Sequence, residues 1–416
     1  MLESQRGQAE AEGIFYGWKI VAALFVILAF TSGLGFYNHS VLLAALAGEA
    51  GFPMAVVSSA VSVFFLVSGF SGLVIGSLLD RYDVRYIIAS GALLASCCLA
   101  VVGYVSEIWQ LYLLYVVFGI GFSASGLLPA TTLIARWFHE SRAKALSIAS
   151  TGLSIGGVIL TPLSAAMIAE NGVAAASPWL GLLYFVGVVP VCLIVLRSEP
   201  GTLGLKADGG KNNLEGNPAL DGIKFAEAIR QRYFWALSVA YLFVMLAQVG
   251  AISHQYGIIS QHLDASNAAY GIAILPLFSI IGRLAGGFII DLFSTSRFTI
   301  CMMLLQSVAL GLMAFAGNAV ILIFGLALFG ITVGNLLMLQ PLLVAEVYGL
   351  VHYSRIYAWS NLVTILGLAV GPALMGYLTV FDATYTLSFF IAAISALFAC
   401  LVYILGKPPR QSDETN

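Results

Sequence analysis

Twelve apolar segments run through this chain, and most are long enough to cross a lipid bilayer as helices. They lie near residues 17–45, 53–79, 86–105, 108–137, 143–169, 178–197, 233–262, 268–291, 297–316, 320–345, 355–379 and 384–406. A bilayer core needs roughly 20 apolar residues to be crossed by a helix. Hydrophobic residues make up 60% of the 416 residues and charged residues only 9%, whereas about a quarter of a soluble domain is charged. The sequence therefore predicts an all-α membrane protein with twelve transmembrane helices.

Basic residues fall almost entirely on one side of this predicted membrane protein. With both termini in the cytoplasm, 17 of the 18 lysines and arginines lie in cytoplasmic loops, tails or the linker. The charged residues of the outer loops are all acidic: Glu49, Glu107, Glu170, Asp264 and Asp382. Because cytoplasmic loops are enriched in Lys and Arg, we expect a multi-pass protein with both termini in the cytoplasm.

The exception is Arg283, which lies well inside the eighth run. Its guanidinium stays protonated, and a charge near the bilayer centre costs roughly 2.5–3.5 kcal/mol on insertion scales. No acidic residue lies in the middle of any run, and Asp291 is about 12 Å along the helix. An arginine fork without a protein partner is suited to bidentate binding of a carboxylate. We favour substrate capture, and the alternative is a structural arginine satisfied by carbonyls and water.

His254, in the middle of the seventh run, is the second candidate. Because the pKa of imidazole is ordinarily about 6.5, it is the natural proton carrier where no acid is available. Its position allows it to share a cavity with Arg283, and the alternative is a hydrogen-bonded packing residue. His39 is the other candidate for proton coupling, although Asn38 and His39 could instead cap the outer surface. Weaker candidates for orienting a small anion are Tyr37, Asn38, Ser123, Tyr256, Asn335 and Asn361.

The loop after the second run reads Gly76-Ser-Leu-Leu-Asp-Arg-Tyr-Asp-Val-Arg85. It resembles the Gly-x-Leu-x-Asp-Arg-x-Gly-x-Arg loop of the major facilitator superfamily, with Asp83 where glycine is usual. An acid and two arginines at a helix–loop junction can form a charge latch between neighbouring helices. The residues assigned to this conformational latch are Asp80, Arg81, Arg85 and Asp291.

Several landmarks recur after about 211 residues. The segment 76–80 closes the second run as 287–291 closes the eighth, and Pro129 and Pro162 recur as Pro341 and Pro372. We therefore expect two six-helix halves with the same orientation around a central cavity, as in the major facilitator fold. The predicted parts are a tail (1–14), a first half (15–197), a linker (198–231), a second half (232–406) and a second tail (407–416).

Glycine-rich segments occur in both halves, from Gly152 to Pro162 and from Gly367 to Pro372. Small residues at helical spacing let helices approach closely, and prolines permit bending. We favour this packing role. The alternative is the similar Gly/Pro motif that is associated with proton antiporters in the superfamily.

Within the superfamily, the chain resembles the monocarboxylate transporter family, and in particular bacterial members related to the oxalate–formate exchangers. The resemblance runs the whole length and rests on Gly17-Trp18, Ile281-Gly-Arg-Leu284 and Gly371-Pro372…Gly376 followed by Tyr385. It implies that Arg283 binds the substrate carboxylate. Ser279 stands where animal members often have an aspartate, and His39 is the nearest match to their lysine late in helix one. Their proton-coupling scheme therefore does not carry over intact.

These observations predict a secondary active transporter of a small, lactate- or pyruvate-like monocarboxylate, coupled to protons by symport. We expect alternating access by a monomer in the bacterial inner membrane. The alternatives are an oxalate–formate type exchanger or an exporter and, from another class, a non-transporting membrane receptor. The sequence has no nucleophile–base pair, metal-ligand cluster or phosphate loop, so we expect neither an enzyme, a metal nor a cofactor. It has no basic stripe typical of nucleic-acid binding, and its five cysteines are expected to be buried hydrophobes.

Overall fold

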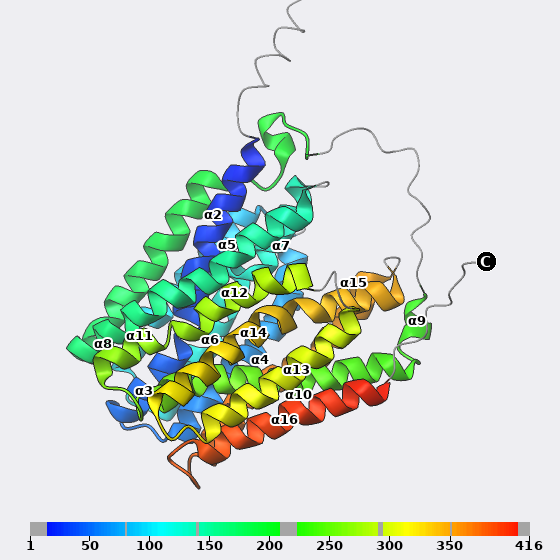
Figure 1. Ribbon diagram of the computed structural model, residues 1–416. Coiled ribbons are helices and arrows are strands. Elements are labelled where there is room, and N and C mark those ends of the chain that lie inside the picture. Colours follow the sequence, from blue (N-terminus) through cyan, green and yellow to red (C-terminus); the bar gives the residue numbers. More distant parts are fainter. Residues whose placement is uncertain are drawn as a thin grey trace, which may run out of the picture.

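The computed structural model describes residues 15–79, 81–138, 141–208, 223–289, 294–349 and 352–406. Within them, eleven helices are long and apolar enough to cross a membrane (Figure 1). One of these, α8 (Arg142–Val195), is interrupted at Gly172, whose φ of 78° and ψ of 160° are not helical. A single helix of its 54 residues would be about 80 Å long, more than twice a bilayer core, so α8 supplies two spans. The predicted all-α membrane fold is confirmed.

The remaining helices follow the apolar runs closely, because the length of each run sets the length of each span. They are α2 (Tyr16–Thr31), the π-helix η2 (Ser32–Phe36), α3 (His39–Gly48), α4 (Met54–Leu79), α5 (Val84–Val101), the short η3 (Val102–Tyr104), α6 (Ile108–Ser125), α7 (Leu127–Trp137), η4 (Pro200–Leu203), α9 (Phe225–Ala228), α10 (Arg232–Ile259), α11 (Ala265–Gly271), α12 (Ile274–Ile289), α13 (Thr295–Ala314), α14 (Ala319–Tyr348), α15 (Tyr353–Leu378) and α16 (Thr386–Gly406).

Helices from the two ends of the chain meet along a seam, which we define by three contacts. Helix α4 packs against α15, α3 packs against α10, and α8 packs against α11 and α12 (Figure 1). At the first contact the Ser62 hydroxyl accepts a hydrogen bond from the Ala373 backbone N–H at 2.9 Å. The seam brings residues of the predicted halves within hydrogen-bonding distance of each other, so it is the place where a shared site can form.

The sequence repeat corresponds to repeated contacts between helices. A Cβ atom added to Gly119 in α6 would collide with the Phe64 carbonyl oxygen, and one added to Gly330 in α14 would collide with that of Leu275. Both members of the first pair lie 211 residues before their counterparts in the second. The same offset relates Gly72 to Arg283, so the partly buried charge stands at a position where the first copy has a glycine.

The glycine-rich segments are tightly packed, as expected. In α8, a Cβ atom on Gly156 would collide with the Ala29 carbonyl oxygen; in α15, one on Gly371 would collide with that of Leu246. These two glycines are 215 residues apart, whereas Pro162 and Pro372 are 210 apart. The two prolines therefore do not occupy equivalent positions in the repeat, because the offset has drifted in these later helices.

Candidate functional site

Arg283 lies on α12 where the seam meets α8, and it lines a cavity of about 330 Å³. Such a volume is at the lower end of the range for ligand pockets. Most of the wall is apolar, as expected for a pocket that admits the hydrocarbon part of a small molecule. The other lining residues are Leu146, Ser147, Ser150, Gly286, Phe298, Asn335, Met338, Leu339 and Leu342, which come from α8, α12, α13 and α14.

The Arg283 guanidinium makes two long hydrogen bonds to backbone carbonyls. Nε donates to the Gly334 oxygen and Nη1 donates to the Ser150 oxygen, both at 3.3 Å. No carboxylate among the described residues lies within ion-pair distance of it. A guanidinium has five N–H donors, so three remain for a ligand. The carbonyl contacts expected of a structural arginine are thus present, but they use only two of the five N–H donors of the guanidinium.

Residues of α8 and α12 face each other at two places along the seam. At the first, Arg283 is hydrogen-bonded to Ser150; at the second, a Cβ atom on Gly157 would lie 2.7 Å from the Tyr37 ring and 2.8 Å from Pro276. Between these two contacts, Ser154 and Ser279 both lie beside the Tyr37 hydroxyl, which is also within electrostatic range of Arg283. Sequence reasoning missed Ser154 and gave Ser279 no role, since the contact joins three spans distant in the chain.

Tyr37 reaches this position because the first span is not a regular helix. The π-helix Ser32–Phe36 separates α2 from α3, and the Tyr37 N–H donates to the Ser32 carbonyl at 2.9 Å. Insertions of this kind rotate the following residues about the helix axis and are common at functional sites. The predicted candidate Tyr37 is therefore brought to the Arg283 side of the seam.

Asn335 is the other predicted candidate that the structure brings to Arg283. Its Nδ2 donates to the carbonyls of Gly282 and Ile331, both at 2.9 Å. A Cβ atom on Gly286 would collide with its Oδ1 atom. Asn335 thus fastens α14 to α12 on either side of Arg283 and holds the arginine against the cavity.

His254 lies at another contact of the seam and is not among the residues that line the Arg283 cavity. Its Nε2 atom donates to the Pro372 carbonyl at 3.1 Å and lies 3.3 Å from the Ser58 hydroxyl. Its Nδ1 atom has no hydrogen-bond partner within the described part of the chain. The structure therefore places His254 where α4, α10 and α15 contact one another. His254 does not share the cavity that Arg283 lines.

Asn38 and His39 are buried, and the Asn38 side chain makes no capping hydrogen bond to the helix that follows it. The His39 ring packs against Phe64, Phe65, Tyr115 and Phe118. Its ring nitrogens and the Asn38 amide have no hydrogen-bond partners among the described residues. The helical segment continues through α3 to Gly48, about ten residues further along the chain, so these two residues lie inside it and not at its end.

The other weak candidates lie elsewhere. Ser123 on α6 faces Gly72 on α4, where an added Cβ atom would lie 3.6 Å from the serine hydroxyl. Tyr256 on α10 and Asn361 on α15 are partly buried. None of the three lines the cavity beside Arg283.

The predicted latch is described in part, because Asp80 and Asp291 lie outside the described residues. Arg81 is exposed. Arg85 pairs with Asp83 at 2.6 Å, and Asp83 also accepts a hydrogen bond from the Ser198 hydroxyl at 2.6 Å. These hydrogen bonds, the one from Arg85 above all, lower the pKa of Asp83 to about 2. The residue that replaces the usual glycine is therefore part of the contact.

Arg136 was also missed in the sequence. Its Nη2 atom donates to the Leu79 carbonyl at 2.7 Å, which satisfies an acceptor at the C-terminus of α4. Its place just before the end of the fourth run is the signal that could have identified it.

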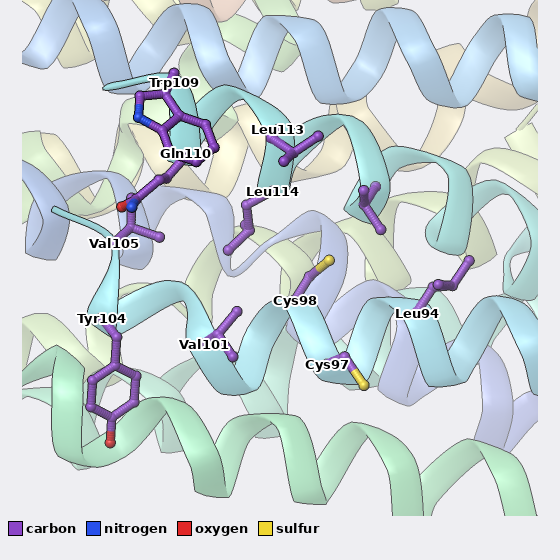
Figure 2. A pocket seen from close by; sticks show the side chains of 11 residues that line it. Leu94, Cys97, Cys98, Val101, Tyr104, Val105, Trp109, Gln110, Leu113 and Leu114 are labelled. Atoms are coloured by element: carbon purple, nitrogen blue, oxygen red, sulfur yellow. The ribbon is translucent and has the colours of Figure 1, made fainter. Parts of the chain in front are cut away.

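A groove of about 470 Å³ between α5 and α6 offers little ligand chemistry. Figure 2 shows Cys97, Cys98 and Leu94 on one helix opposite Leu113 and Leu114 on the other. The side-chain oxygen of its glutamine, Gln110, is occupied by the Glu107 N–H. Cys98, Cys192 and Cys400 are buried as expected, but Cys97 and Cys301 are exposed, because these faces of α5 and α13 do not pack against other helices.

Comparisons with known proteins agree with this architecture. A family model described as Major Facilitator Superfamily matches residues 25–276 and 248–416. MFS-type transporter 1 of an Ophiocordyceps species is 27% identical over 350 residues, which cover 81% of this chain and 72% of that protein. Monocarboxylate transporter 13 of Rattus norvegicus is 24% identical over 384 residues, 91% of this chain and 86% of that protein.

A similar fold occurs among solved structures. The crystal structure of a bacterial homolog of the human lysosomal transporter Spinster has a TM-score of 0.69 and 18% sequence identity. The match covers 95% of this chain and 97% of that one.

Proposed function

The chain belongs to the major facilitator superfamily as a multi-pass membrane transporter, and we propose that it carries a small organic monocarboxylate. The observation that supports this proposal is the half-buried Arg283 fork on the seam, with three free N–H donors beside a cavity. A carboxylate matches such a fork in both charge and geometry. The proposal places a monomer in a bacterial inner membrane, with both termini in the cytoplasm and no nucleic-acid partner.

The position of the cavity supports the proposal of alternating access. Its walls come from α8 on one side of the seam and from α12, α13 and α14 on the other. Rocking of one half against the other changes which end of the seam is open, while the site itself stays between them. Arg283 then holds the substrate during the transition through contacts that both halves share.

In the proposed symport, His254 carries the proton and His39 is the second candidate. A specific observation also favours exchange of organic anions as the second candidate function. His254 does not line the Arg283 cavity, so a bound carboxylate there has no neighbouring imidazole among the described lining residues. An exchanger needs no proton site, because substrate returns on every half-cycle.

Uptake by protein reconstituted in liposomes tests the proposal. We expect saturable uptake of labelled lactate or pyruvate by the wild type. Arg283→Lys keeps the charge but loses the fork, so we expect at least about a tenfold loss of affinity, equivalent to about 1.4 kcal/mol. Properly inserted Arg283→Ala with unchanged transport would exclude the carboxylate anchor. If the protein bound the acids but did not transport them, the remaining function would be that of a non-transporting membrane receptor.

A further inference from the structure

Three hydroxyl groups gather on the seam one helical turn beyond Arg283. We call Tyr37, Ser154 and Ser279 the hydroxyl cluster. They come from the break after η2, from α8 and from α12, and all three side chains are at least nine-tenths buried. Ser154 follows Ser150 by four residues on α8, and Ser279 precedes Arg283 by four on α12. Each step is about 6 Å along its helix.

Both serine hydroxyls in this cluster are buried and lack a hydrogen bond of normal geometry to any described residue. They nevertheless lie beside the Tyr37 hydroxyl. Buried hydroxyls in proteins are almost always hydrogen-bonded, because leaving them unpaired is unfavourable. Each serine hydroxyl has one donor and two acceptor sites, so the pair keeps bonding capacity for an external oxygen even with the Tyr37 hydroxyl beside it.

The surrounding backbone closes the cluster on two sides. Tyr37 and Pro276 crowd Gly157, and a Cβ atom on Gly334 would lie 3.1 Å from the Ser279 hydroxyl. Ser150 and Arg283 line the cavity, whereas the three cluster residues do not line it; Ser154 and Ser279 lie one helical turn along their helices from them. A molecule whose carboxylate binds Arg283 can therefore contact the cluster only through a polar group that is close to that carboxylate.

We propose that the hydroxyl cluster is a specificity subsite that recognises a hydroxyl or oxo oxygen on the carboxylate held by Arg283. This inference rests on the proposed function and assigns roles to Ser154 and Ser279. Serine and tyrosine hydroxyls both donate and accept, so the cluster suits either kind of oxygen. A carboxylate with an unsubstituted hydrocarbon chain leaves both serine hydroxyls as they are in the empty site, so an oxygenated acid gains a hydrogen bond that the unsubstituted acid lacks.

Matched pairs of acids test this assignment on the full-length protein. Lactate is compared with propionate, and 3-hydroxybutyrate with butyrate, by inhibition of labelled uptake and by ligand-induced thermal shift. We expect the wild type to prefer at least one oxygenated acid over its partner by about tenfold or more, which corresponds to one well-made hydrogen bond. In Ser154→Ala and Ser279→Ala the preference should fall below about threefold, because the oxygenated acid loses affinity.

Folding should not confuse this comparison, because neither serine loses a protein hydrogen bond on replacement by alanine. Ser164→Ala is the matched control. Ser164 is on α8, fully buried, and also without a hydrogen-bond partner in the described residues, but it lies ten residues, about 15 Å, beyond Ser154. It should keep the wild-type preference. Tyr37→Phe is a second variant that removes a hydroxyl and keeps the ring against Gly157.

The results separate this inference from the function on which it rests. Wild-type protein that takes both members of each pair equally well, with Arg283→Ala inactive, overturns the subsite and leaves the carboxylate transporter. Serine variants that lose both acids in parallel also overturn it, because a general structural effect would do this. Failure of every acid to bind overturns both.

Discussion

At the scale of single residues, Arg283 is the charged side chain of the cavity, and Ser154 and Ser279 lie one helical turn away from it. Arg283 stands out because it interrupts an apolar run, and an intramembrane charge is a functional candidate by default. Ser154 and Ser279 carry no such signal, since serine is common in membrane spans. Their proximity depends on the π-helix that turns Tyr37 into the seam, which no spacing rule predicts.

His254 provides the test of proton coupling. We expect His254→Gln to abolish accumulation of substrate driven by an imposed pH gradient, because glutamine hydrogen-bonds but does not titrate. Exchange of labelled for unlabelled substrate at equal pH should continue. If the variant still accumulates substrate when only a pH gradient is imposed, His254 is not the coupling residue, and His39→Gln or proton-independent exchange is examined next.

Asp83 should make the stability of the protein depend on acid pH. Its pKa in the folded protein is about 2, below its ordinary value of 3.8, so its contribution is present above pH 4 and is lost as the pH falls towards 2. With partial exposure, we expect Asp83→Asn to cost about 1–2 kcal/mol at neutral pH. Thermal unfolding of the solubilised variant should start a few degrees lower, and the difference should shrink below pH 4. Exposed Arg81→Gln, in the same loop, should show no such change.

At the scale of helices, the apolar runs predicted nearly every span. The fourth run, 108–137, corresponds to α6 and α7, which together end at Trp137 as expected. The eighth run, 268–291, corresponds to a span over Asn267–Gly286. Run length predicts where a helix lies, but it contains no information on which helix lies beside it. The contact of α4 with α15 was therefore not predicted and is known from the structure.

Glycines at close helix–helix contacts should be required for the stability of the folded protein. We expect Gly156→Ala and Gly371→Ala to destabilise the protein by about 1–3 kcal/mol, because each new methyl group meets a backbone carbonyl that cannot move independently. Gly311→Ala on α13 is the control, since its added Cβ atom meets nothing within 4 Å and alanine favours helix. Thermal stability in detergent measures all three. Equal behaviour of the three variants would contradict close packing at the first two sites.

At the scale of the whole molecule, the described conformation has α4 and α15 joined along the seam. We expect a disulfide between Ser62→Cys and Ala373→Cys to arrest transport, because alternating access requires this contact to open. The pair is made in a background without the five native cysteines, and single-cysteine variants are the controls. Reduction should restore activity. Full transport by quantitatively cross-linked protein would show that α4 and α15 do not separate during the cycle.

The repeat that relates Gly72 to Arg283 has an electrical consequence. One half carries a partly buried unit charge at a position where the other has a glycine, and no carboxylate among the described residues pairs with it. The empty seam is therefore positive and becomes neutral when a carboxylate binds. Moving one charge through the full membrane field changes the free energy by about 2.3 kcal/mol per 100 mV, so voltage acts differently on the empty form and on the form that holds the carboxylate without a proton. On a supported membrane, adding substrate should produce a transient current that Arg283→Ala abolishes; an unchanged transient in that variant would assign the moving charge elsewhere.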